Sequence, residues 1–389
     1  MNPRPQPRVI PPAEIPVYSR LPIEIVEGAG RTVVDREGRR YLDLYGGHAV
    51  AALGHGHPVL VEAIIEQSRA LLFQTNAVEL PVRREAVQRL VDFAPEGLCQ
   101  AFLVNSGAEA NENALRMAFR ATGRSAVVAL EQGFHGRTAA AAACTHGSEA
   151  WYGYPTAPFQ RRFVAPNDMD ALEQALDEDC AALIVEAVQG VAGARDLDAS
   201  FLQAARTITQ QRGILLIADE VQCGVGRCGS RFAIEAAGVV PDLMTCAKGL
   251  GGGVPVGAVL ATESVAAPLG VGDLGTTFGG GPLACAAINA VLSVVDDPLF
   301  LSHVQECEDW IRRHCVVGPV RAIQGRGLLL GLRVDRPARD VLADLRQQGI
   351  LAGSAADPQI VRLMPPLTVT LAELEQLRDA LESIQEPAR

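Results

Sequence analysis

Short apolar runs that alternate with helical stretches constrain the fold of this chain more than any other feature. The runs carry apolar residues at nearly every position, so both faces of each predicted strand must be buried. Such strands, separated by helices, indicate an α/β fold with a mostly parallel sheet covered on both sides. The runs lie at Ala101–Val104, Ala126–Leu130, Ala181–Val185, Ile214–Ala218, Leu243–Ala247 and Ala258–Ala261.

The length of 389 residues predicts more than one hydrophobic core. We expect a large domain over residues 58–294, with helices at 61–71 and 108–121. A small α+β domain is expected over 295–389, with helices at 300–315, 340–348 and 371–384 and a strand at 327–334. Residues 1–57 form a proline-rich arm (1–16) and a hairpin (31–44) with its turn near Glu37-Gly38, and we expect them to join the small domain.

Composition and charge narrow the possible partners. The net charge is -11 and no basic block stands out, so nucleic acid is not an expected partner. The chain has no apolar stretch of the roughly 18–20 residues that a transmembrane helix needs, and its N-terminus is too rich in proline for a signal peptide. Nine cysteines without a Cys-x-x-Cys pair indicate free thiols. We expect a soluble, cytoplasmic protein without a membrane partner.

The segment Val104-Asn-Ser-Gly-Ala-Glu-Ala-Asn111 joins a strand end to a helix start. Free N–H groups at a helix N-terminus bind anions, and the small residues Ser106 and Gly107 would let a phosphate approach. An ordinary helix start with Ser106 as N-cap explains the same residues. Both interpretations stay open on this segment alone.

Two further strand ends carry charged side chains. Asp219 and Glu220 follow the apolar run that begins at Ile214, where ligands bind in open α/β sheets. Lys248 follows another such run and enters a glycine-dense loop, with Ala247 and Gly249 as neighbours. Most lysines are solvated surface residues, but a partly desolvated lysine has a lowered pKa and can form an imine with an aldehyde.

Other motifs are weaker. The hydroxyls of Gly275-Thr-Thr-Phe-Gly-Gly-Gly-Pro282 could clamp a second phosphate, or belong to a surface loop. In Phe134-His-Gly-Arg-Thr138 the ring could stack on a flat cofactor and Arg137 could clamp a carboxylate, while His135 fits a hydrogen-bonded structural role. His55 and His57 lack the carboxylates or cysteines that would complete a metal site, so no metal is expected.

Taken in order, these motifs resemble the class III aminotransferases, especially the acetylornithine and ornithine aminotransferase group. The likeness runs from about Tyr18 to Leu381. The matching segments are Leu53–Pro58, Asn105–Asn111, Gly133–Thr138, Asp219–Gln222, Gly224–Gly229, Ala247–Gly253 and Gly275–Gly280. The resemblance implies an aspartate-aminotransferase-like fold (fold type I), with a mostly parallel seven-stranded sheet and a small α+β domain.

The resemblance also implies roles for individual residues. Lys248 would hold pyridoxal 5′-phosphate covalently and move a proton during catalysis, and Asp219 would pair with the pyridine nitrogen. Ser106, Gly107 and Ala108 would cradle the phosphate. The other residues on the cofactor side would be Phe134 and Val221 on the ring faces, His135 and Glu186 beside the ring, Gln222 near the phenolic oxygen, and Thr277 at the cofactor phosphate of a partner subunit.

On the substrate side, the resemblance makes Arg137 the clamp for a carboxylate, with Tyr18 nearby, and places Arg362 at the same site. The family often has a Glu where this chain has Val191, so Arg362 would lack its expected acidic partner and be free for a substrate carboxylate. Other departures on that side are His48, Ala51 and Gly281. We expect a homodimer with shared active sites.

Several activities remain open. The leading prediction is transfer of an amino group from an acetylornithine-like or other diamino or omega-amino acid to 2-oxoglutarate, giving glutamate. A racemase or epimerase on the same scaffold is the main alternative, and it would not depend on an oxo acid. A binding protein without catalysis is disfavoured by Lys248 and Asp219.

Overall fold

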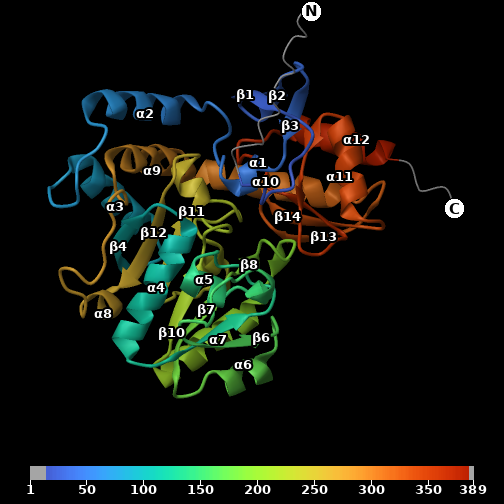
Figure 1. The fold of residues 1–389 in the computed structure, drawn as a ribbon. Coiled ribbons are helices and arrows are strands. Elements are labelled where there is room, and N and C mark those ends of the chain that lie inside the picture. The colour runs from blue at the N-terminus through green and yellow to red at the C-terminus, as the bar shows by residue number, and fades with distance from the viewer. Residues whose placement is uncertain (1–14, 385–389) are drawn as a thin grey trace, which may run out of the picture.

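A seven-stranded sheet forms the centre of the chain (Figure 1). The computed structural model describes residues 15–384. The strand order is β4-β12-β11-β10-β7-β5-β6, and only β12 runs antiparallel to its neighbours. Their bounds are β4 Leu98–Val104, β5 Ala126–Leu130, β6 Gln160–Val164, β7 Cys180–Val185, β10 Leu215–Asp219, β11 Leu243–Ala247 and β12 Gly257–Thr262. The predicted mostly parallel sheet is confirmed.

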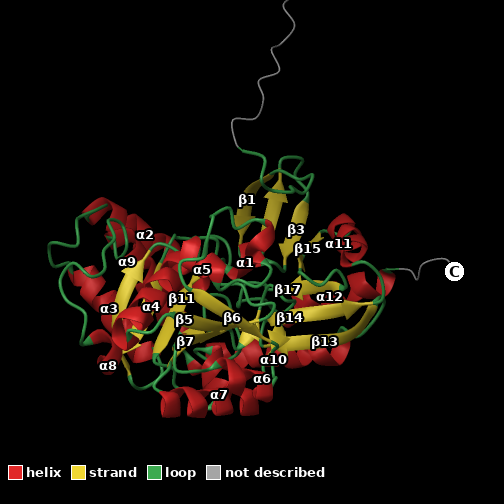
Figure 2. Cartoon of the chain, turned by 60° about the horizontal axis from the view of Figure 1, so that its bottom comes forward, coloured by secondary structure: helices red, strands yellow, loops and turns green. Residues whose placement is uncertain are grey.

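Alternate residues of the central strands pack into two different apolar cores. In β7, Leu183 and Val185 belong to the core that α3, α7 and α9 cover, whereas Ala182 and Ile184 belong to the core beneath α4. Because successive side chains of a strand point to opposite faces, apolar residues at every position require cover on both sides. Figure 2 shows helices on both sides of the sheet. The four helices are α3 Pro81–Phe93, α4 Gly107–Thr122, α7 Ala199–Arg212 and α9 Pro282–Val295.

Shorter elements complete this part of the chain. They are α2 Pro58–Ala70, α5 Ala139–Ala143, α6 Met169–Ala175, α8 Glu263–Ala266 and the two-stranded pair β8 Val188–Gln189 with β9 Arg195–Asp196. Among residues 15–384 no single helix combines the length and apolar composition needed to cross a membrane. Only α9 joined to the bent continuation Pro298–His314 meets those two criteria, and α9 is largely buried in the core.

Two small sheets lie outside the large one, and N-terminal and C-terminal segments meet in one of them. One contains β13 Val320–Arg326, β14 Leu329–Val334, β16 Gly353–Ser354 and β17 Ile360–Leu363, and the other contains β1 Ile25–Ala29, β2 Thr32–Asp35, β3 Arg40–Asp43 and β15 Ile350–Leu351. The antiparallel pairing of β2 with β3 confirms the predicted hairpin, and β15 pairs in parallel with β3. The helices here are α10 Pro298–His314, α11 Ala338–Gln347 and α12 Leu371–Ser383.

A third apolar core lies under α10, α11 and α12. It includes Leu42 and Leu44 from the N-terminal segment together with residues from the last third of the chain, such as Leu332 and Leu363. We propose on this basis that residues 1–57 and 295–389 form a small domain and 58–294 the large one. The predicted extended arm over residues 1–16 lies mostly outside the described residues.

Candidate active site

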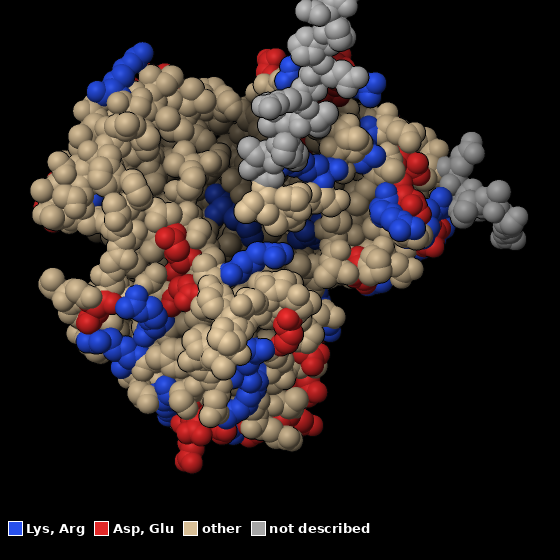
Figure 3. All heavy atoms as spheres, viewed as in Figure 1, with Lys and Arg blue, Asp and Glu red and all other residues tan. Residues whose placement is uncertain are grey.

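A pocket of about 450 Å³ opens where the parallel strands of the large sheet end. Its walls come from the segments that follow β4, β5, β7, β10 and β11, because parallel strands bring their carboxyl ends to one edge. Figure 3 shows basic side chains gathered in the hollow between the two lobes of the molecule. Lys248 and Arg137 are among the residues that line the pocket.

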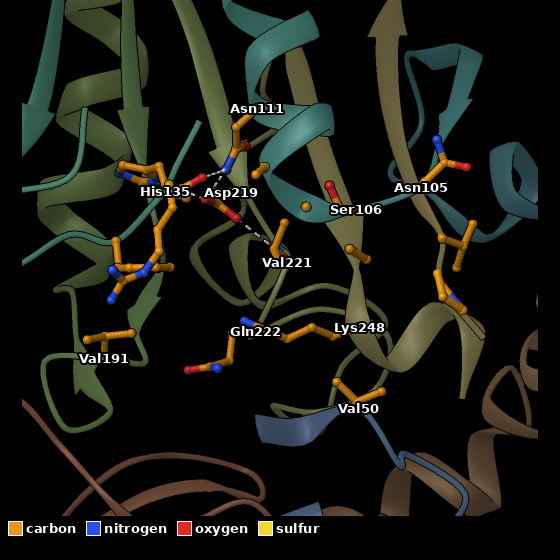
Figure 4. A pocket seen from close by; sticks show the side chains of 18 of the residues that line it. Val50, Asn105, Ser106, Asn111, His135, Val191, Asp219, Val221, Gln222 and Lys248 are labelled. Atoms are coloured by element: carbon orange, nitrogen blue, oxygen red, sulfur yellow. Dashed lines mark hydrogen bonds and ion pairs between the residues drawn. The ribbon is translucent and has the colours of Figure 1, made fainter. Parts of the chain in front are cut away.

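Lys248 lies at the floor of this pocket (Figure 4). It directly follows β11, and its φ of 45° is left-handed, a conformation that strains a residue with a side chain. Burial lowers the pKa of Lys248, although the charges of Asp219 and Glu186 oppose this effect. No residue between 15 and 384 makes a hydrogen bond to its amine. The side chain therefore presents an amine that is more readily neutral, and hence more nucleophilic, than a surface lysine.

Asp219 is held rigidly in the same pocket. It ends β10, which pairs in parallel with β11, so it reaches the same sheet edge as Lys248. Its Oδ2 accepts a hydrogen bond of 2.8 Å from Asn111 Nδ2 and lies 2.7 Å from His135 Nδ1, while Oδ1 accepts the Val221 N–H at 3.0 Å (Figure 4). With 2% of its surface exposed, this carboxylate is fixed in one orientation.

His135 is buried and bound to Asp219, as a structural histidine would be. Burial alone would lower its pKa, but the hydrogen bond to Asp219 and the charges of Asp219 and Glu186 raise it. Its main-chain N–H donates to Thr145 Oγ1 at 2.9 Å. His135 therefore helps to fix the orientation of Asp219.

The start of α4 combines an N-cap with an open cradle. Ser106 Oγ accepts the Glu109 N–H at 3.2 Å, and the Glu109 carboxylate accepts from Asn105 N at 2.8 Å and from the Ser106 hydroxyl at 3.1 Å. The N-cap interpretation of Ser106 is thus correct. Ser106, Gly107 and Ala108 also line the pocket, so the helix N-terminus remains available to an anion there.

Phe134 and Val221 both line the pocket, and we call the part of the pocket next to them the slot. Glu186 lines the same pocket, and its Oε1 accepts the Phe134 N–H at 2.9 Å while Oε2 accepts the Gly190 N–H at 3.2 Å. Burial raises the pKa of Glu186 above its usual range. A Cβ on Gly107 would lie 2.6 Å from Val221 Cγ1, so the slot leaves no room for a side chain at Gly107.

Arg362 comes from β17 and reaches the pocket from the small sheet. Its Nε donates to Ser354 O at 2.6 Å, and its Nη1 donates to Gly190 O at 3.0 Å and to Gln222 Oε1 at 3.4 Å. Neutral oxygens thus orient Arg362, and its role as the clamp for a substrate carboxylate stays a prediction. No carboxylate of residues 15–384 lies within ion-pair distance of this guanidinium, and Val191, where the family often has a Glu, lines the pocket.

The structure does not bring every predicted residue into the pocket. Tyr18 is 75% exposed, and Thr277 is exposed as well; neither lines the pocket of this chain. The neighbouring Thr276 contacts a residue of the pocket instead, because its hydroxyl accepts a hydrogen bond from Asn105 Nδ2 at 3.3 Å. Arg137 lies at the rim with its guanidinium over the Trp151 ring, 4.5 Å from the centroid. In residues 15–384 no group of His, Cys, Asp or Glu is arranged to hold a metal ion.

Two residues of the site were missed. Asn111 holds Asp219, and its own Oδ1 accepts from Thr245 Oγ1 at 2.7 Å. The sequence could have indicated this residue, because Asn111 lies four residues after Gly107 and residues i and i+4 share one face of a helix. Tyr45, which interacts with Arg362, carried no such signal, since the two residues are far apart in the chain.

Comparison with known proteins agrees with this geometry. The profile of the family "Aminotransferase class-III" matches residues 16–385. An acetylornithine aminotransferase of Mesorhizobium japonicum is 42% identical over 375 residues, which cover 92% of each chain. The crystal structure of the ornithine aminotransferase from Toxoplasma gondii superposes with a TM-score of 0.88 at 29% identity, covering 95% of this chain and 91% of that one. An amine transaminase from an uncultivated Pseudomonas species, solved in its PLP-bound form, gives a TM-score of 0.88 at 26% identity and covers 96% of this chain and 98% of its own.

This chain therefore belongs to the class-III aminotransferases. The family implies a cofactor that is held by a lysine at the end of a strand. Lys248 directly follows β11 and lines the pocket, so it is such a lysine.

Proposed function

We propose that this protein is a pyridoxal-phosphate-dependent aminotransferase with Lys248 as its cofactor-binding lysine. The observation that carries the proposal is the juxtaposition of Lys248 and Asp219 at the ends of two neighbouring parallel strands. One offers an amine without a hydrogen-bond partner among the described residues, and the other a fixed, buried carboxylate. An aldehyde cofactor with a basic ring nitrogen matches both groups.

The rest of the pocket fits such a cofactor. The start of α4, with Ser106, Gly107 and Ala108, would receive its phosphate. The slot between Phe134 and Val221 would take a flat ring, and a Cβ at Gly107 would narrow this slot. Gln222 would lie near the phenolic oxygen, and Glu186 and His135 beside and behind the ring. The residues of this one pocket could therefore hold the phosphate, the ring and the aldehyde group of the cofactor.

When bound, pyridoxal phosphate supplies an electron-withdrawing ring that stabilises the charge left on the substrate carbon after a proton is removed. Asp219 would pair with the ring nitrogen and keep it protonated, because Asn111, His135 and the Val221 N–H hold its carboxylate in one orientation. The Nζ of Lys248 would take the proton from the substrate carbon and deliver it to the carbon that the cofactor contributes as its aldehyde. Burial of Lys248 favours the neutral amine that this task requires.

For the substrates, we propose an acetylornithine-like or other diamino or omega-amino acid as donor and 2-oxoglutarate as acceptor. The names of the similar proteins support this donor class, although they differ among themselves between acetylornithine, ornithine and other amines. Arg362 would take a substrate carboxylate inside the pocket, and Arg137 and Tyr18 would act at its rim.

The proposed active unit is a homodimer in which Thr277 of one subunit reaches the phosphate site of its partner. The exposure of Thr277 and of the neighbouring Phe278, which is 66% exposed, supports this arrangement. Sedimentation of the purified protein would test it. The cytoplasmic location remains a prediction that cell fractionation can check.

The decisive experiment is a visible spectrum of the purified protein after incubation with pyridoxal phosphate. A lysine-bound cofactor gives a visible band, which glutamate alone should bleach and 2-oxoglutarate should restore. Lys248→Ala should lose both the band and turnover. A racemase would keep its band in glutamate, and a colourless protein would refute the cofactor assignment.

A further inference from the structure

The guanidinium of Arg137 lies over the indole ring of Trp151 beside the pocket. The distance from Cζ to the ring centroid is 4.5 Å, within the roughly 6 Å at which a cation is attracted to the face of an aromatic ring. Arg137 lines the pocket, whereas Trp151, which follows η1 (Ser148–Ala150), does not. The ring therefore reaches the pocket only through the arginine.

This stacking occupies a face of the guanidinium and leaves its edges open. The five N–H donors of an arginine lie in the plane of the group, so a ring above that plane takes none of them. Among residues 15–384 the Arg137 side chain makes no hydrogen bond and no ion pair, and the Trp151 ring is the group that holds it. Its donors are therefore available to a ligand in the pocket.

Arg362, the other arginine considered for a substrate carboxylate, is oriented in a different way. Its Nε and Nη1 already donate to three neutral oxygens. A stacked arginine keeps both donors of an edge, and a carboxylate binds most strongly when two parallel N–H groups reach its two oxygens. The Trp151 ring thus orients Arg137 without using any of the donors that such a bond needs.

Trp151 is itself held against the segment that carries Arg137. Its main-chain N–H donates to Ser148 O at 2.9 Å, and Ser148 is fully buried. The hydroxyl of the next residue, Tyr152, donates to Ala139 O at 2.9 Å. These bonds tie the two segments together, so the position of the ring beside Arg137 is determined by the fold.

We propose that Trp151 is a positioning residue: its ring holds the Arg137 guanidinium in the orientation in which it binds a substrate carboxylate at the rim of the pocket. 2-Oxoglutarate carries two carboxylates, so Arg137 acts on one at the rim while Arg362 acts on the other inside the pocket. The inference rests on the proposed function, because it assigns Trp151 to the substrate side of that same site. A contact that only stabilised the fold would leave carboxylate binding unchanged when the ring is removed.

The test compares Trp151→Leu, Trp151→Phe and the matched control Tyr154→Leu in the holoenzyme. Tyr154 belongs to the same segment and is exposed, and its ring contacts Tyr152. Glutarate, a dicarboxylate without an amino group, serves as the probe, and calorimetry measures its dissociation constant. Trp151→Leu should bind glutarate about three- to fivefold more weakly, the loss expected for an exposed cation–π contact. Trp151→Phe keeps an aromatic face and Tyr154→Leu keeps the contact itself, so both should stay within about twofold of the wild type.

The same comparison in an Arg137→Met background separates positioning from packing. If Trp151 acts through Arg137, Trp151→Leu should cause no further loss of glutarate affinity once the guanidinium is gone. In steady-state assays with Arg137 present, Trp151→Leu should raise the KM for 2-oxoglutarate by the same factor as the dissociation constant and change kcat little. An unchanged dissociation constant in Trp151→Leu, or an equal loss in both backgrounds, would overturn the proposal.

The fluorescence of Trp151 gives a readout that needs no substitution at this residue. The chain has two tryptophans, and the other, Trp310, lies on α10 and stacks on His314. In Trp310→Phe, glutarate should change the Trp151 emission with the same dissociation constant as calorimetry gives, because a carboxylate then pairs with the cation on the ring. Arg137→Met should abolish this change, and an emission that stays constant while glutarate binds would also refute the proposal. Failure of the proposed function is a separate result: glutamate would then leave the visible band of the wild type unchanged, whereas glutarate binding needs no transamination.

Discussion

His135 Nδ1 lies 2.7 Å from Asp219 Oδ2, and both side chains are almost completely buried. Both side chains line the pocket, and His135 holds the Asp219 carboxylate in place there. Such an arrangement fixes the position of the carboxylate before any ligand arrives.

Replacing Asp219 by asparagine should lower kcat for transamination by about 100-fold or more, because a neutral amide cannot keep a ring nitrogen protonated. The matched control is Glu220→Gln, since Glu220 is the next residue, is equally buried, and turns away to accept the N–H groups of Ala233 and Ile234 at 3.0 and 2.7 Å. Its kcat should stay within about threefold of the wild type. Steady-state rates with glutamate and an oxo acid check both, and an Asp219→Asn enzyme of normal rate would contradict the role of this carboxylate.

Gly107 allows a second prediction, about cofactor affinity. Alanine there would bring a Cβ to 2.6 and 2.9 Å from the two methyl carbons of Val221, which must then move into the slot. We expect Gly107→Ala to bind pyridoxal phosphate about tenfold more weakly. Titration of the apoenzyme, followed by visible absorbance, measures the affinity.

Gly270→Ala is the control for this change, because a Cβ there makes only an ordinary contact at 3.7 Å with Asp273. Addition of cofactor should also raise the unfolding temperature of Gly107→Ala less than that of Gly270→Ala, since stabilisation by a ligand follows its affinity. Equal shifts in both variants would show that the slot tolerates the methyl group.

Glu220 makes stability depend on pH. Burial raises the pKa of Glu220 to about 7, whereas a glutamate in an unfolded chain titrates near about 4.3. Between these values the folded protein holds the extra proton, so the contribution of Glu220 to the free energy of unfolding falls as pH rises through this window. Glu220→Gln has no proton to lose and lacks this fall.

The unfolding temperature of Glu220→Gln minus that of the wild type should therefore become more positive between about pH 5.5 and about pH 8. A difference that stays flat with pH would mean that Glu220 is already ionised in the folded protein at the lower pH.

The sequence predicted the central strands well and the sheet edges poorly. The runs Ala126–Leu130 and Leu243–Ala247 match β5 and β11 to the residue, because strands covered on both faces are apolar throughout. β6 was missed, since it lies at the sheet edge and carries Arg161 and Arg162 within its five residues. Edge strands are partly solvated and lack the continuous apolar pattern.

The same distinction applies to the site. Asp219, Lys248 and Glu186 follow apolar strands, and parallel pairing brings strand ends together whatever the details of the loops. The contact of Tyr45 with Arg362 depends instead on a left-handed turn and on the packing of the N-terminal segment against β16, which no local pattern specifies. The partners of Arg362 could not be predicted for the same reason, because they are main-chain oxygens and an amide from three separate segments.

Arg362 gives the last prediction. Three neutral oxygens orient its guanidinium without neutralising it, so it can attract a carboxylate throughout the reaction. Arg362→Met should raise the KM for 2-oxoglutarate by about 10- to 100-fold, the range expected when a charge-assisted hydrogen bond is lost. Arg333→Met, on the neighbouring strand β14, removes an arginine that pairs with Asp357 at 3.3 Å outside the pocket, and its KM should stay within about twofold. If both variants kept the wild-type KM, carboxylate binding would have to move to Arg137 at the rim, and Arg137→Met would then show the loss instead.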